Sequence, residues 1–155
     1  MIKLGQLHTF MANLNLVALE NIDSWAENIR LEAVCKDQGT GLLLFRQEYD
    51  AVISIERFPH TRHPVEFLFA QVITWLMEND SEREDQHLGQ PSVESDILDA
   101  NLADLDITIP FAEDVQAIPD ENGPIVINGQ KYRLANYEID YAETGDLGEV
   151  DPDAS

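Results

Sequence analysis

Residues 42–79, LLLFRQEYDAVISIERFPHTRHPVEFLFAQVITWLMEN, decide the fold. In the first half, the odd positions from Leu43 to Ile55 are apolar except at Gln47, and most even positions are polar. Because successive side chains of a strand point to opposite faces, this alternation predicts a strand with one buried face and one wet face.

The second half changes period. Its apolar side chains recur at steps of three and four residues, which places them on one stripe of a helix. They are Val65, Leu68, Phe69, Val72, Trp75 and Leu76. Pro59 and Pro64 mark the change, and a proline such as Pro64 suits the first turn of a helix. The predicted organising unit is therefore a long antiparallel strand that leads into a core-facing helix.

The predicted strand is long. At about 3.3 Å per residue, a strand over residues 42–58 would extend about 55 Å, more than a strand of ordinary length. We therefore expect it either to bend near residues 46–48 or to project at one end as an arm. An arm of this kind would be a natural contact for a neighbouring subunit.

Two further elements are predicted upstream of this unit. Apolar residues at helical spacing predict an N-terminal helix over about residues 3–14. Ser24 and Glu27 have the spacing of a capping box, which predicts a single helical turn. Alternation over residues 29–36, followed by a glycine-rich turn, predicts the first strand of a β-hairpin over residues 28–58.

Downstream of the helix, the polar and acidic residues 79–96 predict a surface loop. Alternation then predicts a third strand over residues 105–111, and residues 115–118 suggest a weaker fourth strand. Residues 125–134 predict a small hairpin around the Asn128-Gly129 turn.

These elements predict an α+β fold with a mostly antiparallel four-stranded sheet and helices packed on one face. Residues 1–134 form the expected single domain. Residues 135–155 carry seven acidic side chains and no lysine or arginine, which predicts an acidic, partly disordered tail. Tyr137, Ile139 and Tyr141 are the exception, because their alternation would suit pairing with an edge strand or a partner.

The balance of charge is the dominant global feature. Nine lysines and arginines against 30 acidic residues give a net charge of −21, so nucleic acid phosphates and anionic membranes should repel the chain. This charge suits solubility, a salt-tolerant source, a surface kept off DNA, or a basic partner. No apolar run approaches the roughly 20 residues of a membrane span, and the amphipathic N-terminus is not typical of a secretory signal.

Candidate catalytic and metal-binding groups are few. His60 and His63 have H-x-x-H spacing, but Pro59 and Pro64 place them in a loop without nearby cysteine or paired acids. The single cysteine, Cys35, permits no internal disulfide, which fits a reducing cytoplasm, and its strand position predicts a packing role on the inward face. The usual nucleophile, phosphate-loop and zinc motifs are absent from the sequence. We therefore predict no enzyme, no cofactor and no metal site.

Interface candidates come from side chains that suit a monomer poorly. Phe67 shares the polar helix face with Gln71, so it is either covered by a loop or held for a partner. Ile73 and Met77 widen the apolar stripe to one side, which suits a second packing surface. The predicted contact residues are Arg46, Glu48, Phe67, Gln71, Tyr137, Ile139 and Tyr141. Arg57 and Arg62, like Arg46, form either internal ion pairs or anchors for an acidic neighbour.

Three groups of residues occur in an order that resembles a known family. They are Phe45 and Tyr49, then Trp75-Leu76 with Glu78-Asn79, then Asp96-Ile97, Asn101 and Leu105-Asp106-Ile107 with Ile109. Over roughly residues 28–122 this succession resembles the tail completion protein R family of contractile-tailed temperate phages.

The resemblance implies a structural role and a tail-terminator-like fold. A protein of this kind would cap the head-proximal end of the tail tube and sheath and help to join the tail to the capsid. Its implied partners are further copies in a ring, hexameric by analogy with tail terminators, together with tube, sheath and head–tail connector proteins. DNA would pass through such a ring without specific binding, and an acidic lumen would prevent it from sticking. The implied location is the host cytoplasm during assembly of the phage or prophage, then the virion tail.

An alternative from another functional class is an acidic inhibitor or nucleic-acid mimic that binds a basic protein. It would use residues 82–85, residues 104–106 and the tail in place of phosphates. A mimic would place its carboxylates on one face and act as a monomer or dimer, whereas a tail protein would multimerise with tail components.

Overall fold

The computed structural model describes residues 1–135. The elements follow the order α1 (Ile2–Asn13), a 3₁₀ turn (Leu19–Asn21), β1 (Ile22–Asp37), β2 (Leu42–Pro59), α2 (Val65–Asn79), β3 (Ser92–Ile97), β4 (Leu102–Pro119), β5 (Ile125–Ile127) and β6 (Gln130–Leu134). Residue contacts divide the chain into two units. Unit 1 contains residues 1–30 and 48–113, and unit 2 contains residues 31–47 and the chain from Asp114 onward. The strands β1, β2 and β4 each contribute residues to both units.

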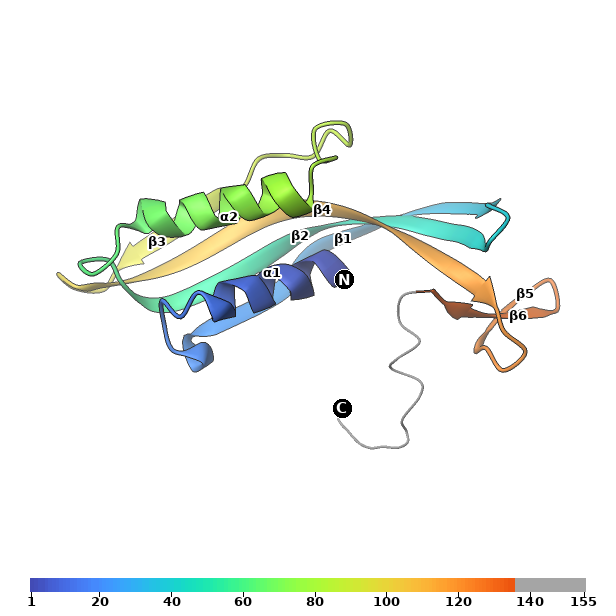
Figure 1. Cartoon of the computed structure of the whole chain (residues 1–155), viewed down its shortest axis with the longest axis horizontal. Coiled ribbons are helices and arrows are strands. Elements are labelled where there is room, and N and C mark those ends of the chain that lie inside the picture. Colours follow the sequence, from blue (N-terminus) through green and yellow to red (C-terminus); the bar gives the residue numbers. More distant parts are fainter. Residues whose placement is uncertain (136–155) are drawn as a thin grey trace. The chain divides into compact units, whose positions relative to one another are not determined.

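The expected α+β class is confirmed, but the expectation of a four-stranded sheet is wrong. The sheet has six strands in the order β1-β2-β4-β6-β5, with β3 paired to β4 (Figure 1). The third and fourth predicted strands are one strand, β4, whose inward face includes the charged residue Glu113 and so interrupts the apolar pattern. The polar segment expected as a loop supplies β3, all six residues of which are exposed.

The core of unit 1 lies between one face of the sheet and the two helices (Figure 1). Leu7 and Met11 of α1, four residues of α2 and the odd-numbered inward residues of β2 and β4 form one cluster. Trp75 belongs to this cluster, as the stripe predicts, and its ring meets the Phe111 ring edge-on at a centroid distance of 6.3 Å. The helical and strand periodicities of residues 42–79 therefore meet in a single core.

A buried carboxylate attaches α1 to the sheet. Glu113 accepts hydrogen bonds from the backbone N–H groups of Ile2 and Lys3, at 3.0 and 2.9 Å, and from the hydroxyl of Tyr49. Tyr49 is fully buried, and Glu113 is 9% exposed. Because the first N–H groups of a helix have no intrahelical partner, Glu113 supplies the acceptor that α1 lacks in its own sequence.

The predicted helical turn at Ser24–Glu27 is wrong, because β1 already begins at Ile22. The Ser24 hydroxyl does not cap a helix. It lies 2.8 Å from Nδ1 of His8 on α1, so the side chain joins strand and helix. A short helical turn occurs earlier, at Leu19–Asn21.

In unit 2, the predicted hairpin is confirmed by the pairing of β5 with β6. Asn128 and Gly129 both have positive φ, 51° and 81°, as a two-residue hairpin turn requires. The turn before β5 also depends on glycine, since a Cβ on Gly123 would lie 2.1 Å from the Tyr132 carbonyl oxygen.

Candidate docking surfaces

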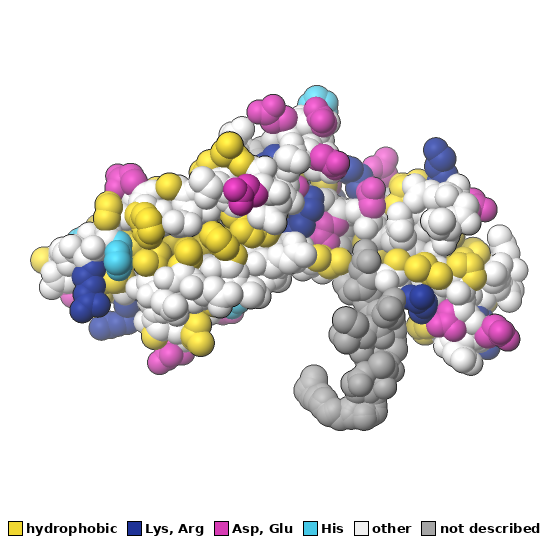
Figure 2. All heavy atoms as spheres, viewed as in Figure 1, with side chains coloured by type: hydrophobic (Ala, Val, Ile, Leu, Met, Phe, Trp, Pro, Cys, Tyr) yellow, Lys and Arg dark blue, Asp and Glu magenta, His cyan; other side chains and the backbone are white. Residues whose placement is uncertain are grey.

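The outer side of α2 carries a second apolar stripe. Phe67, Ala70, Ile73 and Met77 are spaced by three or four residues and are all exposed, with Met77 at 69%. Figure 2 shows apolar side chains at the surface over this helix. We call these four residues the α2 outer stripe. A contiguous exposed apolar stripe of this kind is typical of a protein contact.

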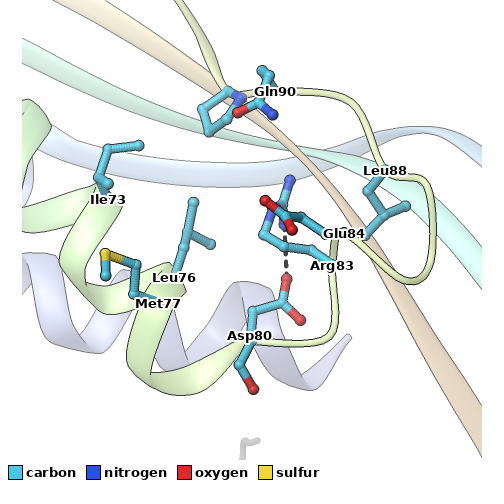
Figure 3. A pocket seen from close by; sticks show the side chains of 10 residues that line it. Ile73, Leu76, Met77, Asp80, Arg83, Glu84, Leu88 and Gln90 are labelled. Carbon is cyan, nitrogen blue, oxygen red and sulfur yellow. Dashed lines mark hydrogen bonds and ion pairs between the residues drawn. The ribbon is translucent and has the colours of Figure 1, made fainter.

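The stripe ends in a pocket at the C-terminal end of α2 (Figure 3). The pocket holds about 400 Å³ and lies wholly within unit 1. Ile73, Leu76 and Met77 form its helical side, and Leu88 and Pro91 lie on the connection to β3. The apolar residues of both walls could receive an apolar side chain from a partner.

One buried acid holds this pocket in shape. Asp80, whose side chain is 1% exposed, accepts a hydrogen bond from Lys3 at 2.6 Å and another from Arg83 at 2.7 Å. Arg83 also donates to the Gly89 carbonyl at 2.9 Å, so the chain after α2 is fixed to the helix end. Both cations lie about 6 Å from the centroid of the Phe111 ring. Two of the nine basic residues therefore form a partly buried network with Asp80 beside the pocket.

The edge strand β1 is the second apolar surface. Ile22 is the only buried residue of β1, and β1 is the first strand in the sheet order. In unit 1, Trp25 is 38% exposed and Ile29 is 51% exposed. In unit 2, Leu31 and Val34 are exposed as well. Because an edge strand presents backbone groups that can pair with another chain, β1 has the chemistry of a protein contact.

The sheet face of unit 1 that lies opposite the helices is acidic. In the pairing of β3 with β4, Glu94 stands directly opposite Asp106, and Asp96 stands opposite Asp104. Glu48 and Asp50 of β2 occupy positions that alternate with the buried ones and so point to the same face. Directly opposite like charges destabilise a sheet, so this face is not optimised for stability.

We expect Glu94→Lys to raise the free energy of unfolding by about 1 kcal/mol, because it replaces a repulsive pair with an attractive one. Glu94→Gln should give about half of that gain, since it removes only the repulsion. Thermal unfolding at low ionic strength measures the change, and added salt should reduce it. Equal stability of the unmodified chain and both variants would contradict the conclusion that Glu94 and Asp106 face each other.

The predicted contact residues fall in different places. Phe67 is 43% exposed, and its ring stacks on His63, in the connection between β2 and α2, at a centroid distance of 6.3 Å. Gln71 is half-buried beside the stripe.

Glu48 of β2 is half-buried in unit 1, 3.6 Å from Arg30, whereas Arg46 is half-buried in unit 2. The boundary between the units crosses β2 between residues 47 and 48, within the stretch where a bend is expected. Tyr137, Ile139 and Tyr141 lie outside the described residues.

The histidines and the cysteine have ordinary surroundings. His60 contacts the Asp99 carbonyl oxygen at 3.3 Å, and His63 stacks on Phe67. Within residues 1–135, no three His, Cys, Asp or Glu side chains converge as metal ligands would. The prediction that Cys35 is packed inward is wrong, because it is exposed. Asn28 and Cys35 both have positive φ, 53° and 52°, and such residues shift the alternation of a strand.

Asp99 organises the connection before β4. Its carboxylate accepts hydrogen bonds from the backbone N–H groups of Asn101 and Leu102, at 2.7 and 2.8 Å. These two bonds, with smaller contributions from the charges of Arg57 and His60, hold the pKa of Asp99 below its usual value.

The sequence placed Phe67, Ile73 and Met77 off the core-facing stripe of α2, but it did not predict the pocket or the exposure of β1. The pocket needs residues on both α2 and the following connection, and no periodicity links them. Within residues 1–135, no helix is both long and apolar enough to span a membrane.

Comparison with known proteins relates the chain to phage proteins. No solved structure gives a significant match. One curated relative is an uncharacterised 19.2 kDa protein from the rep-hol intergenic region of Haemophilus phage HP1 (strain HP1c1). It is 30% identical over 128 residues, which cover 82% of this chain and 77% of the relative. The family model for the P2 phage tail completion protein R (GpR) matches residues 1–136, so the chain belongs to the GpR family of phage tail completion proteins.

Proposed function

We propose that this protein caps the head-proximal end of a contractile phage tail, on both tube and sheath, and helps to join the tail to the capsid. It acts without catalysis, as one subunit of a ring whose other contacts are tube, sheath and head–tail connector proteins. It assembles in the host cytoplasm and remains in the virion tail. DNA passes through the ring without specific binding. Membership of the GpR family supports the tail role.

The observation that supports assembly into a ring is the presence of two unlike apolar surfaces on unit 1. The α2 outer stripe and its pocket form one surface, and the edge strand β1 forms the other. The strand that follows the pocket in the chain is β3. In the sheet, β2 and β4 lie between β1 and β3. Contacts between two different patches are heterologous, and heterologous contacts close into rings when their rotation allows it.

The direct test uses purified tube protein that polymerises in solution. Adding this chain should stop elongation, so that light scattering reaches a lower plateau and electron microscopy shows shorter tubes with extra density at one end. Bovine serum albumin at equal concentration controls for non-specific effects. Unchanged tube length and no co-sedimentation with tube or sheath would refute the capping role. A monomer in solution before mixing would not, because the ring can form on the tail.

The acidic sheet face favours a second candidate, an inhibitor that resembles nucleic acid and binds a basic protein. The two candidates use different surfaces. Asp106→Lys combined with Glu94→Lys would abolish mimicry but leave tube capping intact, so the same tube assay on this variant separates them.

A further inference from the structure

The sheet of unit 1 has two open edges. Among the strands that reach unit 1 the order is β1-β2-β4-β3, so within residues 1–135 the outer edges of β1 and β3 pair with no other strand there (Figure 1). All six residues of β3 are exposed, and so are residues 27–30 of β1. An unpaired edge presents N–H and C=O groups that another chain can bond.

The two edge strands run in opposite directions. β1 and β2 are neighbours joined by the short turn at residues 38–41, which only antiparallel strands allow. β2 and β4 are antiparallel as well, because the Arg57 N–H donates to Asp104, whereas the later His60 N–H donates to the earlier Asn101. β4 and β3 are antiparallel too. Copies set side by side in one orientation would therefore bring β3 of one copy against β1 of the next as an antiparallel pair.

The open edge of β3 is apolar on one side of the sheet and acidic on the other. Ile97 stands opposite the buried Ala103, so it lies on the side of the helices, where it is 65% exposed. The preceding residue, Asp96, stands opposite Asp104 on the acidic face. A strand that suits this edge needs an apolar side chain toward the helices and a cation toward the acids.

The open edge of β1 has that chemistry. Arg30 lies 3.6 Å from Glu48, so its side chain is on the acidic face. Ile29 precedes it and therefore points to the side of the helices, where it is 51% exposed. The guanidinium group has five N–H donors, so Arg30 can bond a further carboxylate and keep its present contact.

A single register satisfies both faces. In an antiparallel pair, setting Ile29 of one copy opposite Ile97 of the next also sets Arg30 opposite Asp96. Arg30 would then offset the repulsion between Asp96 and Asp104, and the two isoleucines would cover each other.

The favourable part of this contact is short. Further along β1, the same register would set Glu32 opposite Glu94, and directly opposite like charges repel. A short contact forms best where several copies are held together, so we expect it on the tail rather than in dilute solution.

We propose that neighbouring copies in the ring join by antiparallel pairing of β1 with β3, with Ile29 opposite Ile97 and Arg30 opposite Asp96. This pairing rests on the proposed ring and names the residues that connect its subunits. Because all copies have one orientation, their helices lie on one side of the joined sheet and their acidic faces on the other. A shared acidic face suits the side turned toward DNA, which it repels.

Disulfide trapping tests the pairing. Ile29→Cys with Ile97→Cys, in a chain whose own thiol is removed by Cys35→Ser, sets two cysteines opposite each other at the contact. Within one chain, β2 and β4 separate these positions by about 14 Å, too far for a disulfide, so any link between them joins two copies. After mild oxidation on capped tubes, we expect a ladder of linked chains on a non-reducing gel, and peptide mass spectrometry should identify the 29–97 link.

Leu19→Cys with Ile97→Cys is the matched control. Leu19 is 64% exposed and lies on the 3₁₀ turn before β1, so it should form at least about tenfold fewer links. Equal linking by both pairs would overturn the pairing, as would the absence of a ladder on tubes that the Ile29–Ile97 variant still caps.

The fate of the pairing can be told apart from that of the capping role. Oxidation of the same variant at high protein concentration, without tubes, tests the contact alone. A ladder there without tube capping would support the pairing and refute the tail role. Capping without a ladder would refute only the pairing. Hydrogen exchange of the unmodified chain gives a second measurement, since the β3 amides should exchange more slowly on capped tubes, and unchanged exchange there would overturn the pairing.

A charge swap tests the Arg30–Asp96 contact. Arg30→Asp in the double-cysteine chain should lower the linked fraction about threefold, and adding Asp96→Arg should restore it, because opposite charges meet again. Adding Glu20→Arg instead makes the same change in net charge at an exposed position outside β3 and should not restore it. Circular dichroism confirms that the variants are folded. Equal recovery by both arginines would overturn the contact, since it would show an effect of net charge alone.

Discussion

Glu113→Ala is expected to lower the free energy of unfolding by about 4 kcal/mol. The substitution leaves the fully buried Tyr49 hydroxyl and two backbone N–H groups of α1 without their acceptor. A buried donor without an acceptor costs about 1–3 kcal/mol, and the N–H groups of Ile2 and Lys3 are only partly buried, so they lie at the low end.

Urea unfolding followed by tryptophan fluorescence measures this loss, because Trp75 lies in the same core as Tyr49. Glu113→Gln should cost less, since its amide oxygen still accepts hydrogen bonds while its NH₂ group faces a donor. Glu121→Ala, at an exposed turn of unit 2, should change stability by less than about 0.5 kcal/mol. A comparably small loss for Glu113→Ala would show that this carboxylate does not hold α1 on the sheet.

Ile73→Glu combined with Met77→Glu should weaken binding to tail proteins about 100-fold while leaving the fold intact. Both side chains are exposed, at 43% and 69%, so their replacement removes no core packing. They line the pocket at the end of the α2 outer stripe, where a partner side chain would be desolvated. Residues at the centre of such contacts typically contribute 2 kcal/mol or more, and about 2.7 kcal/mol corresponds to 100-fold.

The tube-capping assay and co-sedimentation with sheath protein measure the effect. Val126→Glu is the control for an added acid, because it places one at another exposed apolar position, in unit 2. Val126→Glu should cap tubes like the unmodified chain. Equal impairment by both variants would attribute the loss to added negative charge and would remove the α2 outer stripe from the proposed interface.

The part of the fold that the sequence predicts best is the part with a local cause. The strand expected over residues 42–58 is β2, Leu42–Pro59, and the expected helix is α2, Val65–Asn79. Each has one buried face with its own period, and Pro59 and Pro64 separate the two. The hairpin at residues 125–134 was equally predictable, because Asn128 and Gly129 adopt the positive φ that its turn needs.

The predictions failed where a polar residue had a distant partner. Glu113 interrupts the apolar pattern of β4, and only its bonds to α1 and Tyr49, 64 positions away, make an inward acid tolerable there. Along β1, the inward packing expected of Cys35 failed because every residue from Glu27 to Asp37 is exposed, on both faces of the strand. Neither feature has a periodic signal in the sequence.

The sequence by itself therefore determined the β2–α2 unit and the α+β class, since periodicity and turn chemistry act over a few residues. The tertiary structure alone decided that β3 completes a six-stranded sheet, that α2 and the chain after it enclose a pocket, and that the acids of β3 and β4 face each other. Each of these depends on strand register or on contacts between distant segments, and those are set by packing of the whole domain rather than by local pattern.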